Sequence, residues 1–280
     1  MKWDQIIPDI KIITADEAKA TLHTVNSSGI QLVDVRQIKE YNINHLPGAI
    51  PLPLVTLTDG RAHLNKQKPI LLYSQTGNRA LMAARWLHSH NFEDVAVIRG
   101  GIETWTGLKA FGHFDLNLNL LLPEADFPDA VTLAYAMEEG LRQFYIQLAK
   151  ETDDELYKDL YRELAQYEVL HMQKLARKYH IELGHTPIQK AENRFQGQLT
   201  EGGGFLNMSL IRSLVHMNNI SKVYSLSLAF ETQALDFYYR LSMQAENTEV
   251  KHFFEEMADS ERVHLAYVSK KLDDYLENNL

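Results

Sequence analysis

The sequence contains no cysteine among its 280 residues. This absence excludes disulfide bonds, thiolate-bound metals, iron–sulfur clusters and any persulfide chemistry carried by the chain itself. The sequence also lacks an apolar run of 18 or more residues, and its first residues, MKWDQIIPDIK, have no signal-peptide pattern. We therefore expect a cytoplasmic protein with no membrane partner.

Basic residues are also fewer than acidic residues. The chain has 28 Lys and Arg against 37 Asp and Glu, a net charge of −9, and no basic run. This balance argues against non-specific binding to nucleic acid. A hydrophobic content of 45% is ordinary for a globular protein, and the length suits about two domains, each with its own core.

The first part of the chain, residues 1–112, alternates short β-branched runs with helical patterns. Residues 30–35, 69–73 and 95–98 are typical of strands, and residues 78–90 have the apolar spacing of a helix. This alternation predicts an α/β domain built on a sheet.

A loop leads from the second of these strands into that helix. Its backbone N–H groups and the helix dipole favour a bound anion, to which Arg79 would add a bidentate fork. Asp34 and Arg36 are expected to pair beside this loop. The predicted anion-binding residues are Ser74, Gln75, Thr76, Gly77, Asn78 and Arg79.

This domain resembles the rhodanese family in five segments, residues 32–36, 40–41, 45–49, 74–79 and 100–105. Rhodaneses begin the active-site loop with a cysteine that carries sulfane sulfur, whereas this chain has Ser74. A hydroxyl cannot form a persulfide and ionises too weakly to replace a thiolate. The resemblance therefore implies a rhodanese fold without sulfurtransferase activity. Ser74 is then either a hydroxyl that caps a helix or part of a non-covalent anion sensor or docking surface.

Residues 113–127 are short on periodic pattern and are expected to connect the two domains. Residues 128–280 carry one pattern twice: a Glu, then, 30 residues later, Glu-x-x-His. An offset of 93 residues relates the two copies, as 231−138, 261−168 and 264−171. The six residues of the pattern are Glu138, Glu168, His171, Glu231, Glu261 and His264.

The interval of 30 residues has a geometric meaning. A turn midway between the two glutamates of each copy, near Asp153 and near residues 246–247, would bring both to the same height in an antiparallel helix pair. A capping box from Thr152 to Glu155 is expected to open the second helix. Two such hairpins, joined by a long crossover with a short helix at residues 205–215, predict an all-α, ferritin-like four-helix bundle.

The six residues would meet in the bundle core, where four unpartnered carboxylates would be prohibitive. Two divalent cations would balance the four negative charges. Carboxylate oxygens with two imidazoles suit iron, with manganese as the alternative, better than zinc. We expect two iron ions held by the six side chains.

The C-terminal half resembles the rubrerythrin group of ferritin-like proteins, through Glu138 with Tyr145, residues 168–171, Glu231 with Tyr238, and residues 261–264. The resemblance implies a di-iron centre that reduces peroxide or activates dioxygen. A four-cysteine rubredoxin-like site is missing, so an external electron donor protein is expected. Both tyrosines lie two turns from their glutamates and are interpreted as core aromatics with a satisfied hydroxyl, with an outer-shell or electron-transfer role as the alternative.

Three functional hypotheses follow. The first is a di-iron oxidoreductase acting on a small oxidant such as peroxide, with the Ser74 loop as an anion-binding or regulatory module. The second is an iron-binding sensor or storage module without significant turnover. The third is a metal-free bundle that serves for homodimer formation.

Overall fold

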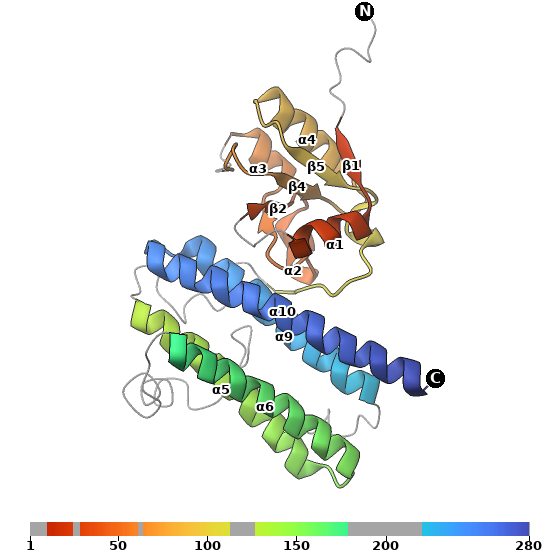
Figure 1. Cartoon of the computed structure of the whole chain (residues 1–280). Coiled ribbons are helices and arrows are strands. Elements are labelled where there is room, and N and C mark those ends of the chain that lie inside the picture. The colour runs from red at the N-terminus through yellow and green to blue at the C-terminus, as the bar shows by residue number, and fades with distance from the viewer. Residues whose placement is uncertain (1–9, 25–28, 61–63, 113–126, 179–219, 280) are drawn as a thin grey trace, which may run out of the picture. The chain divides into compact units, whose positions relative to one another are not determined.

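The computed structural model describes residues 10–24, 29–60, 64–112, 127–178 and 220–279. The chain divides into two compact units, residues 1–116 and 117–280, which are treated separately below (Figure 1). The expected connector lies outside the described residues except for Phe127, and the expected helix at 205–215 lies wholly outside them. No helix in the described ranges has the length and apolar character needed to cross a membrane.

The first unit is built on a five-stranded sheet whose neighbouring strands are all parallel. The strand order is β1-β5-β4-β2-β3, so β4 lies at the centre and ends where the Ser74 loop begins. The carboxyl edge of a parallel sheet is the usual place for a ligand site. The strands are β1 Lys11–Ile13, β2 Gln31–Asp34, β3 Ile50–Pro51, β4 Ile70–Tyr73 and β5 Val95–Ile98.

Helices cover both faces of this sheet, because alternate strand residues point in opposite directions. Val33 and Leu72 pack into one apolar cluster with the buried side of α4, whereas Leu32 and Leu71 belong to a second cluster with Tyr41 of α2. This arrangement confirms the predicted α/β fold. The helices are α1 Ala15–Thr24, α2 Ile38–Ile43, α3 Leu54–Thr58, α4 Asn78–Ser89 and the 3₁₀ helix η3 Gly101–Thr104.

The second unit contains two long helical hairpins, which confirms the predicted all-α bundle. In the first, α5 (Phe127–Glu151) packs along α6 (Glu155–Lys178). In the second, α9 (Ile220–Gln244) packs along α10 (Thr248–Asn279) (Figure 1). The two turns fall at residues 152–154 and 245–247, where the spacing of the glutamates predicted them.

The start of α6 differs from expectation, because no capping box centred on Thr152 opens it. The residue directly before the helix is Asp154, and its Oδ1 accepts the N–H of Leu156 at 2.9 Å. In the second hairpin, Asn247 Oδ1 likewise accepts the N–H of Glu249 at 2.8 Å. Both α6 and α10 are therefore capped by an Asx side chain at the residue before the helix.

The bundle core consists of two apolar clusters rather than one. In α5, residues 130–137 belong to one cluster and residues 141–149 to the other, with Glu138 between them. The second cluster also takes residues 160–165 of α6, N-terminal to Glu168. A polar layer therefore lies across the bundle between two regions of hydrocarbon, which limit the access of water to it.

Candidate metal centre and the Ser74 loop

The structure brings all six residues of the repeated pattern into this polar layer. The four carboxylates are completely buried at 0% exposure, and His264 is 6% exposed. His171 is partly buried, with a side-chain exposure of 16%. Each helix contributes at the same level: Glu138 from α5, Glu168 and His171 from α6, Glu231 from α9, and Glu261 and His264 from α10.

Each histidine faces the glutamate on the other helix of its own hairpin. His171 Nδ1 lies 3.1 Å from Glu138 Oε2, and His264 Nδ1 lies 2.9 Å from Glu231 Oε2. The two imidazole rings meet edge to face, with 4.7 Å between their centroids. Both copies of the sequence repeat thus form the same glutamate–histidine contact. The two helical hairpins approach each other at the histidines.

Two overlapping groups of side chains have ligand atoms close enough to share an ion. Glu138, Glu168 and His171 form one, and His171, Glu261 and His264 form the other; within each, the ligand atoms lie within 4.8 Å of one another. Glu231 belongs to neither group, although it lies against His264. The layer therefore contains two overlapping groups of side chains that could each hold a cation, with His171 common to both.

Within the described part of the chain, most carboxylate oxygens of this layer have no hydrogen bond. Of the eight oxygens on the four glutamates, seven have no hydrogen-bond partner among the described residues, Glu138 Oε2 being the exception. A buried carboxylate without a partner is strongly disfavoured. Such a concentration of unpaired acceptors on one level is the arrangement expected of metal ligands.

The same crowding opposes ionisation of the acids. Burial, followed by the charges of the neighbouring glutamates, raises the pKa of Glu168 well above its usual value. Burial likewise raises the pKa of Glu261 well above normal, and raises that of Glu231 to about 7. Without cations, the layer must hold protons to remain folded.

The histidines divide into a charged and a neutral one. Burial lowers the pKa of His171, but the surrounding glutamates, Glu138 foremost, together outweigh burial and raise this pKa to about 10. Burial and the nearby His171 charge lower the pKa of His264 to about 4. Burial opposes ionisation of Glu138, yet its pKa falls because of His171. Cations that enter the layer must therefore displace protons.

The donor set itself favours particular metals. Carboxylate oxygens combined with imidazole nitrogen suit iron and manganese, whereas a zinc site usually has four ligands in a tetrahedron. Six side chains around two adjacent positions exceed what a single tetrahedral ion can use. The residues present therefore fit a pair of iron or manganese ions.

In the first unit, the Ser74 side chain serves as a cap. Ser74 is 1% exposed, and its Oγ accepts the N–H groups of Gly77 at 3.1 Å and Ala80 at 3.4 Å. The Ser74 carbonyl accepts the N–H of Ile102 at 2.9 Å. Only glycine fits at position 101, because a Cβ there would lie 2.0 Å from that carbonyl oxygen. The loop is thus closed by its own hydrogen bonds.

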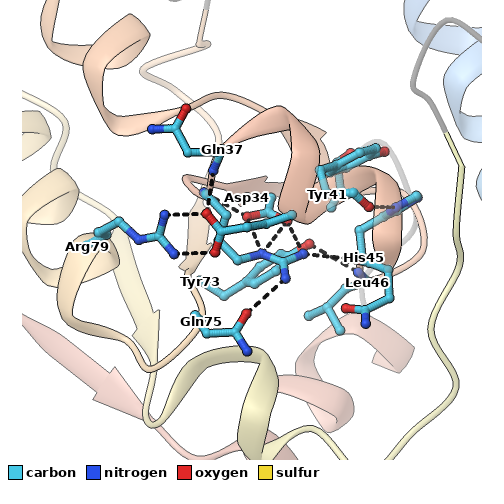
Figure 2. A network of polar contacts seen from close by, with 12 residues as sticks. Asp34, Gln37, Tyr41, His45, Leu46, Tyr73, Gln75 and Arg79 are labelled. Atoms are coloured by element: carbon cyan, nitrogen blue, oxygen red, sulfur yellow. Dashed lines mark hydrogen bonds and ion pairs between the residues drawn. The ribbon is translucent and has the colours of Figure 1, made fainter.

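The Arg79 guanidinium is paired within the domain, and its expected part in anion binding stays a prediction. Both of its terminal nitrogens donate to the Glu40 carboxylate at 2.6 Å (Figure 2). This pairing lowers the pKa of Glu40 to about 2. The two terminal nitrogens of Arg79 are occupied because Glu40, on α2, lies directly opposite them. Anion binding by the loop as a whole stays a prediction.

The expected pair of Asp34 and Arg36 is confirmed. Arg36 Nε donates to both carboxylate oxygens of Asp34 at 3.0 Å, and both residues are buried. Gln75 Oε1 accepts a hydrogen bond from Arg36 at 3.2 Å (Figure 2). Its Nε2 donates to Glu103 Oε1 at 3.1 Å, which joins the pair to Glu103. Both arginines beside the loop are therefore neutralised by carboxylates within the domain.

Our reading of the sequence placed Tyr145 and Tyr238 in the core, and both are buried in the apolar clusters. It missed Tyr167 and Tyr267, which lie next to the polar layer on α6 and α10. The only signal was their spacing, one residue before Glu168 and three residues after His264. Such spacing places a side chain near a ligand only if two helices approach each other there.

Comparison with protein families gives two matches. The rhodanese-like domain model matches residues 14–108, and the rubrerythrin model matches residues 222–279. The second match covers α9 and α10, whereas α5 and α6 are linked to it by the repeat.

Individual relatives match between about a quarter and two fifths of the chain. The thiosulfate sulfurtransferase GlpE of Pseudomonas savastanoi pv. phaseolicola is 31% identical over 97 residues, 35% of this chain and 88% of that protein. The putative sulfur carrier protein YrkF of Bacillus subtilis is 32% identical over 82 residues, 29% of this chain and 44% of that protein. A crystal structure of a rhodanese-like domain protein from Staphylococcus aureus is 29% identical and has a TM-score of 0.31. The match covers 34% of this chain and 91% of that chain.

Proposed function

The chain belongs to the rhodanese-like family and also carries a rubrerythrin domain; from this premise we propose that it is a non-haem di-iron oxidoreductase. It would reduce peroxide or dioxygen with electrons from an external donor protein. The first domain would act as an anion-binding or regulatory module without sulfur transfer. Manganese is the alternative metal, and a metal-binding sensor or storage role is the alternative function.

One observation carries this proposal: seven buried carboxylate oxygens lie on a single level with no hydrogen bond among the described residues. Two divalent cations would neutralise the four carboxylates and use their unpaired oxygens as ligands. Without cations, the raised pKa values of Glu168 and Glu261 require the layer to hold protons instead. A structural bundle would gain nothing from such an arrangement.

The residues have distinct roles in this proposal. His171 and His264 each anchor one ion, and the four glutamates hold or bridge the pair. When bound, two ferrous ions supply the two electrons that reduction of an O–O bond requires. The apolar clusters on either side of the layer limit water, which strengthens the electrostatic interactions within it.

The electrons must come from another molecule. Because the chain has no cysteine, it cannot hold the four-cysteine iron site that would serve as an internal donor. The donor is therefore a separate redox protein or a small reductant.

The test is metal analysis combined with peroxide consumption, on protein purified without chelators and then loaded anaerobically with ferrous iron. We expect two metal ions per chain, and peroxide consumption faster than that of free iron. Glu168→Gln should lose at least one ion and slow consumption by more than about tenfold, since even the loss of a supporting residue costs that much. Glu155→Gln, an exposed change on the same helix, is the control.

The outcomes separate the hypotheses. Bound iron that consumes peroxide no faster than free iron would support the sensor or storage role. Protein that binds no iron or manganese under these conditions would contradict both metal-dependent functions.

A further inference from the structure

Two tyrosines on different helices of the bundle touch through their hydroxyl groups. Tyr167 of α6 and Tyr267 of α10 form a hydrogen bond in which either oxygen can be the donor, and their ring centroids are 5.0 Å apart. The Tyr167 ring lies 5.6 Å from the His264 imidazole. Tyr267 is 38% exposed. The pair therefore links a candidate metal ligand to the protein surface.

The Glu163 carboxylate accepts a hydrogen bond from this pair. The Tyr167 hydroxyl donates to Glu163 Oε1 at 3.2 Å, and Lys271 Nζ donates to the same oxygen at 3.0 Å. Lys271 also lies 5.6 Å above the Tyr267 ring. Hydroxyl groups both donate and accept, so a continuous hydrogen-bonded path runs from Tyr267 through Tyr167 to Glu163.

Packing alone does not account for these contacts. Phenylalanine would fill the same space beside His264, and a partly exposed tyrosine can direct its hydroxyl to water. Instead, the two hydroxyls are directed at each other, and the Tyr167 hydroxyl is also directed at Glu163. By contrast, Tyr145 and Tyr238 lie inside the apolar clusters and away from the surface.

We propose that Tyr167 and Tyr267 form a relay that carries single electrons from the protein surface to the metal pair. This inference rests on the proposed peroxide-reducing function. Each tyrosine would give up an electron and a proton together. Tyr167 would be oxidised first, because it lies against His264, and Tyr267 would restore it.

The step balances as follows. Reduction of hydrogen peroxide to two waters breaks the O–O bond and takes two electrons and two protons. If the metal pair, when bound, supplied only one of these electrons, Tyr167 would supply the other and pass its hydroxyl proton to Glu163. Tyr267 then returns an electron and a proton to Tyr167 and becomes the neutral phenoxyl radical. An external reductant restores Tyr267 with one electron, and solvent supplies its proton. Glu163 releases to solvent the proton that it took from Tyr167, and solvent supplies the two protons that the peroxide takes up.

The experiment is electron paramagnetic resonance on iron-loaded full-length protein, frozen after a peroxide pulse without reductant. We expect a tyrosyl radical whose hyperfine pattern collapses when the protein contains ring-deuterated tyrosine. Tyr167→Phe should lower its yield by at least tenfold. Tyr267→Phe should move the remaining radical to Tyr167. Tyr157→Phe, a partly buried tyrosine elsewhere on α6, is the control and should leave the yield unchanged.

A second measurement needs no metal. Photo-oxidation of metal-free protein with a ruthenium complex and persulfate should place an unpaired electron on Tyr267, and the signal should be lost in Tyr267→Phe. A yield that Tyr267→Phe leaves unchanged would contradict the role of Tyr267 as the surface end.

Failure of this inference can be told apart from failure of the proposed function. Normal iron content and peroxide consumption with no tyrosyl radical, or with equal radical yield in Tyr167→Phe, would overturn the relay alone. Absence of bound metal would overturn both, and metal analysis of the same samples identifies that case.

Discussion

At the scale of single residues, similar side chains have different roles because their surroundings differ. Glu168 is buried among other acids and its pKa is raised, whereas Glu40 faces Arg79 and its pKa is lowered to about 2. Ser74 is equally dependent on context. Its hydroxyl accepts two loop N–H groups, so the position that carries a nucleophile in rhodaneses here caps a helix.

The Ser74 environment predicts what a cysteine would do there. In Ser74→Cys, the N–H groups of Gly77 and Ala80 would stabilise a thiolate, because they already donate to this position. We expect sulfur transfer from thiosulfate to cyanide to become measurable, with none in the parent protein. Ser89→Cys, an exposed position, serves as the control for a thiol alone. No gain would mean that the loop itself no longer binds thiosulfate.

The polar layer predicts a pH dependence with a definite sign. Between pH 6.5 and about 10, the folded metal-free protein keeps a proton on His171 that the unfolded chain loses. The raised pKa of Glu231 acts in the same direction between 4.5 and about 7. Above pH 6.5, where the lowered pKa of His264 no longer opposes them, stability should therefore fall as pH rises.

Thermal unfolding of the chelator-treated full chain at pH 6.5, 7.5 and 8.5 would measure this slope. His171→Gln should flatten it. Metal affinity should rise over the same range, since metal must displace the His171 proton. A melting temperature of the bundle that rises with pH in the absence of metal would contradict these assignments.

At the scale of secondary structure, the turns decide which side chains face each other. Each turn lies midway between two glutamates, so an antiparallel hairpin brings them to one level. Asn247 defines the start of α10, accepting the N–H groups of Glu249 at 2.8 Å and Val250 at 3.3 Å. The position of Glu261 along the bundle depends on where this helix begins.

Loss of this cap should weaken the second hairpin. Asn247→Ala removes the acceptor for two N–H groups, which should destabilise the bundle by about 1 kcal/mol and lower its melting temperature by about 2–4 °C. Asn247→Asp keeps the acceptor and should be close to neutral. Calorimetry of the full chain measures both, and an equal loss in the two variants would show that the cap is unimportant.

At the scale of the whole molecule, the chain contains two compact units with separate cores and different chemistry. The first unit pairs both arginines beside its loop with carboxylates, and the second gathers four glutamates and two histidines in its interior. Among the described residues, the groups of side chains that could hold a cation all lie in the second unit. Metal should therefore act on one unit and not on the other.

This difference predicts the effect of metal on unfolding. Ferrous or manganous ions at about 100 times their dissociation constant should stabilise the bundle by about 2.7 kcal/mol, raising its transition by about 5–10 °C. The transition of the first unit should not move. Calorimetry of the full chain with metal and then with chelator measures both, and a shift of both transitions would contradict independent units.

Much of this architecture was predictable from local patterns. Periodicity and spacing predicted the strands at 69–73 and 95–98, the two hairpin turns and the common level of the glutamates. These features follow from the regular geometry of helices and strands. The start of α6 was misplaced because Thr152 and Asp154 are both good caps, and only the position of the turn selects between them.

The sequence by itself determined the two folds, the six residues of the repeated pattern and the loss of the sulfur nucleophile, because each is written in residue type and interval. Only the tertiary structure decided that Arg79 pairs with Glu40 and that Tyr167 meets both His264 and Tyr267. These contacts join residues on different elements. Their formation depends on how those elements pack, which no local interval specifies.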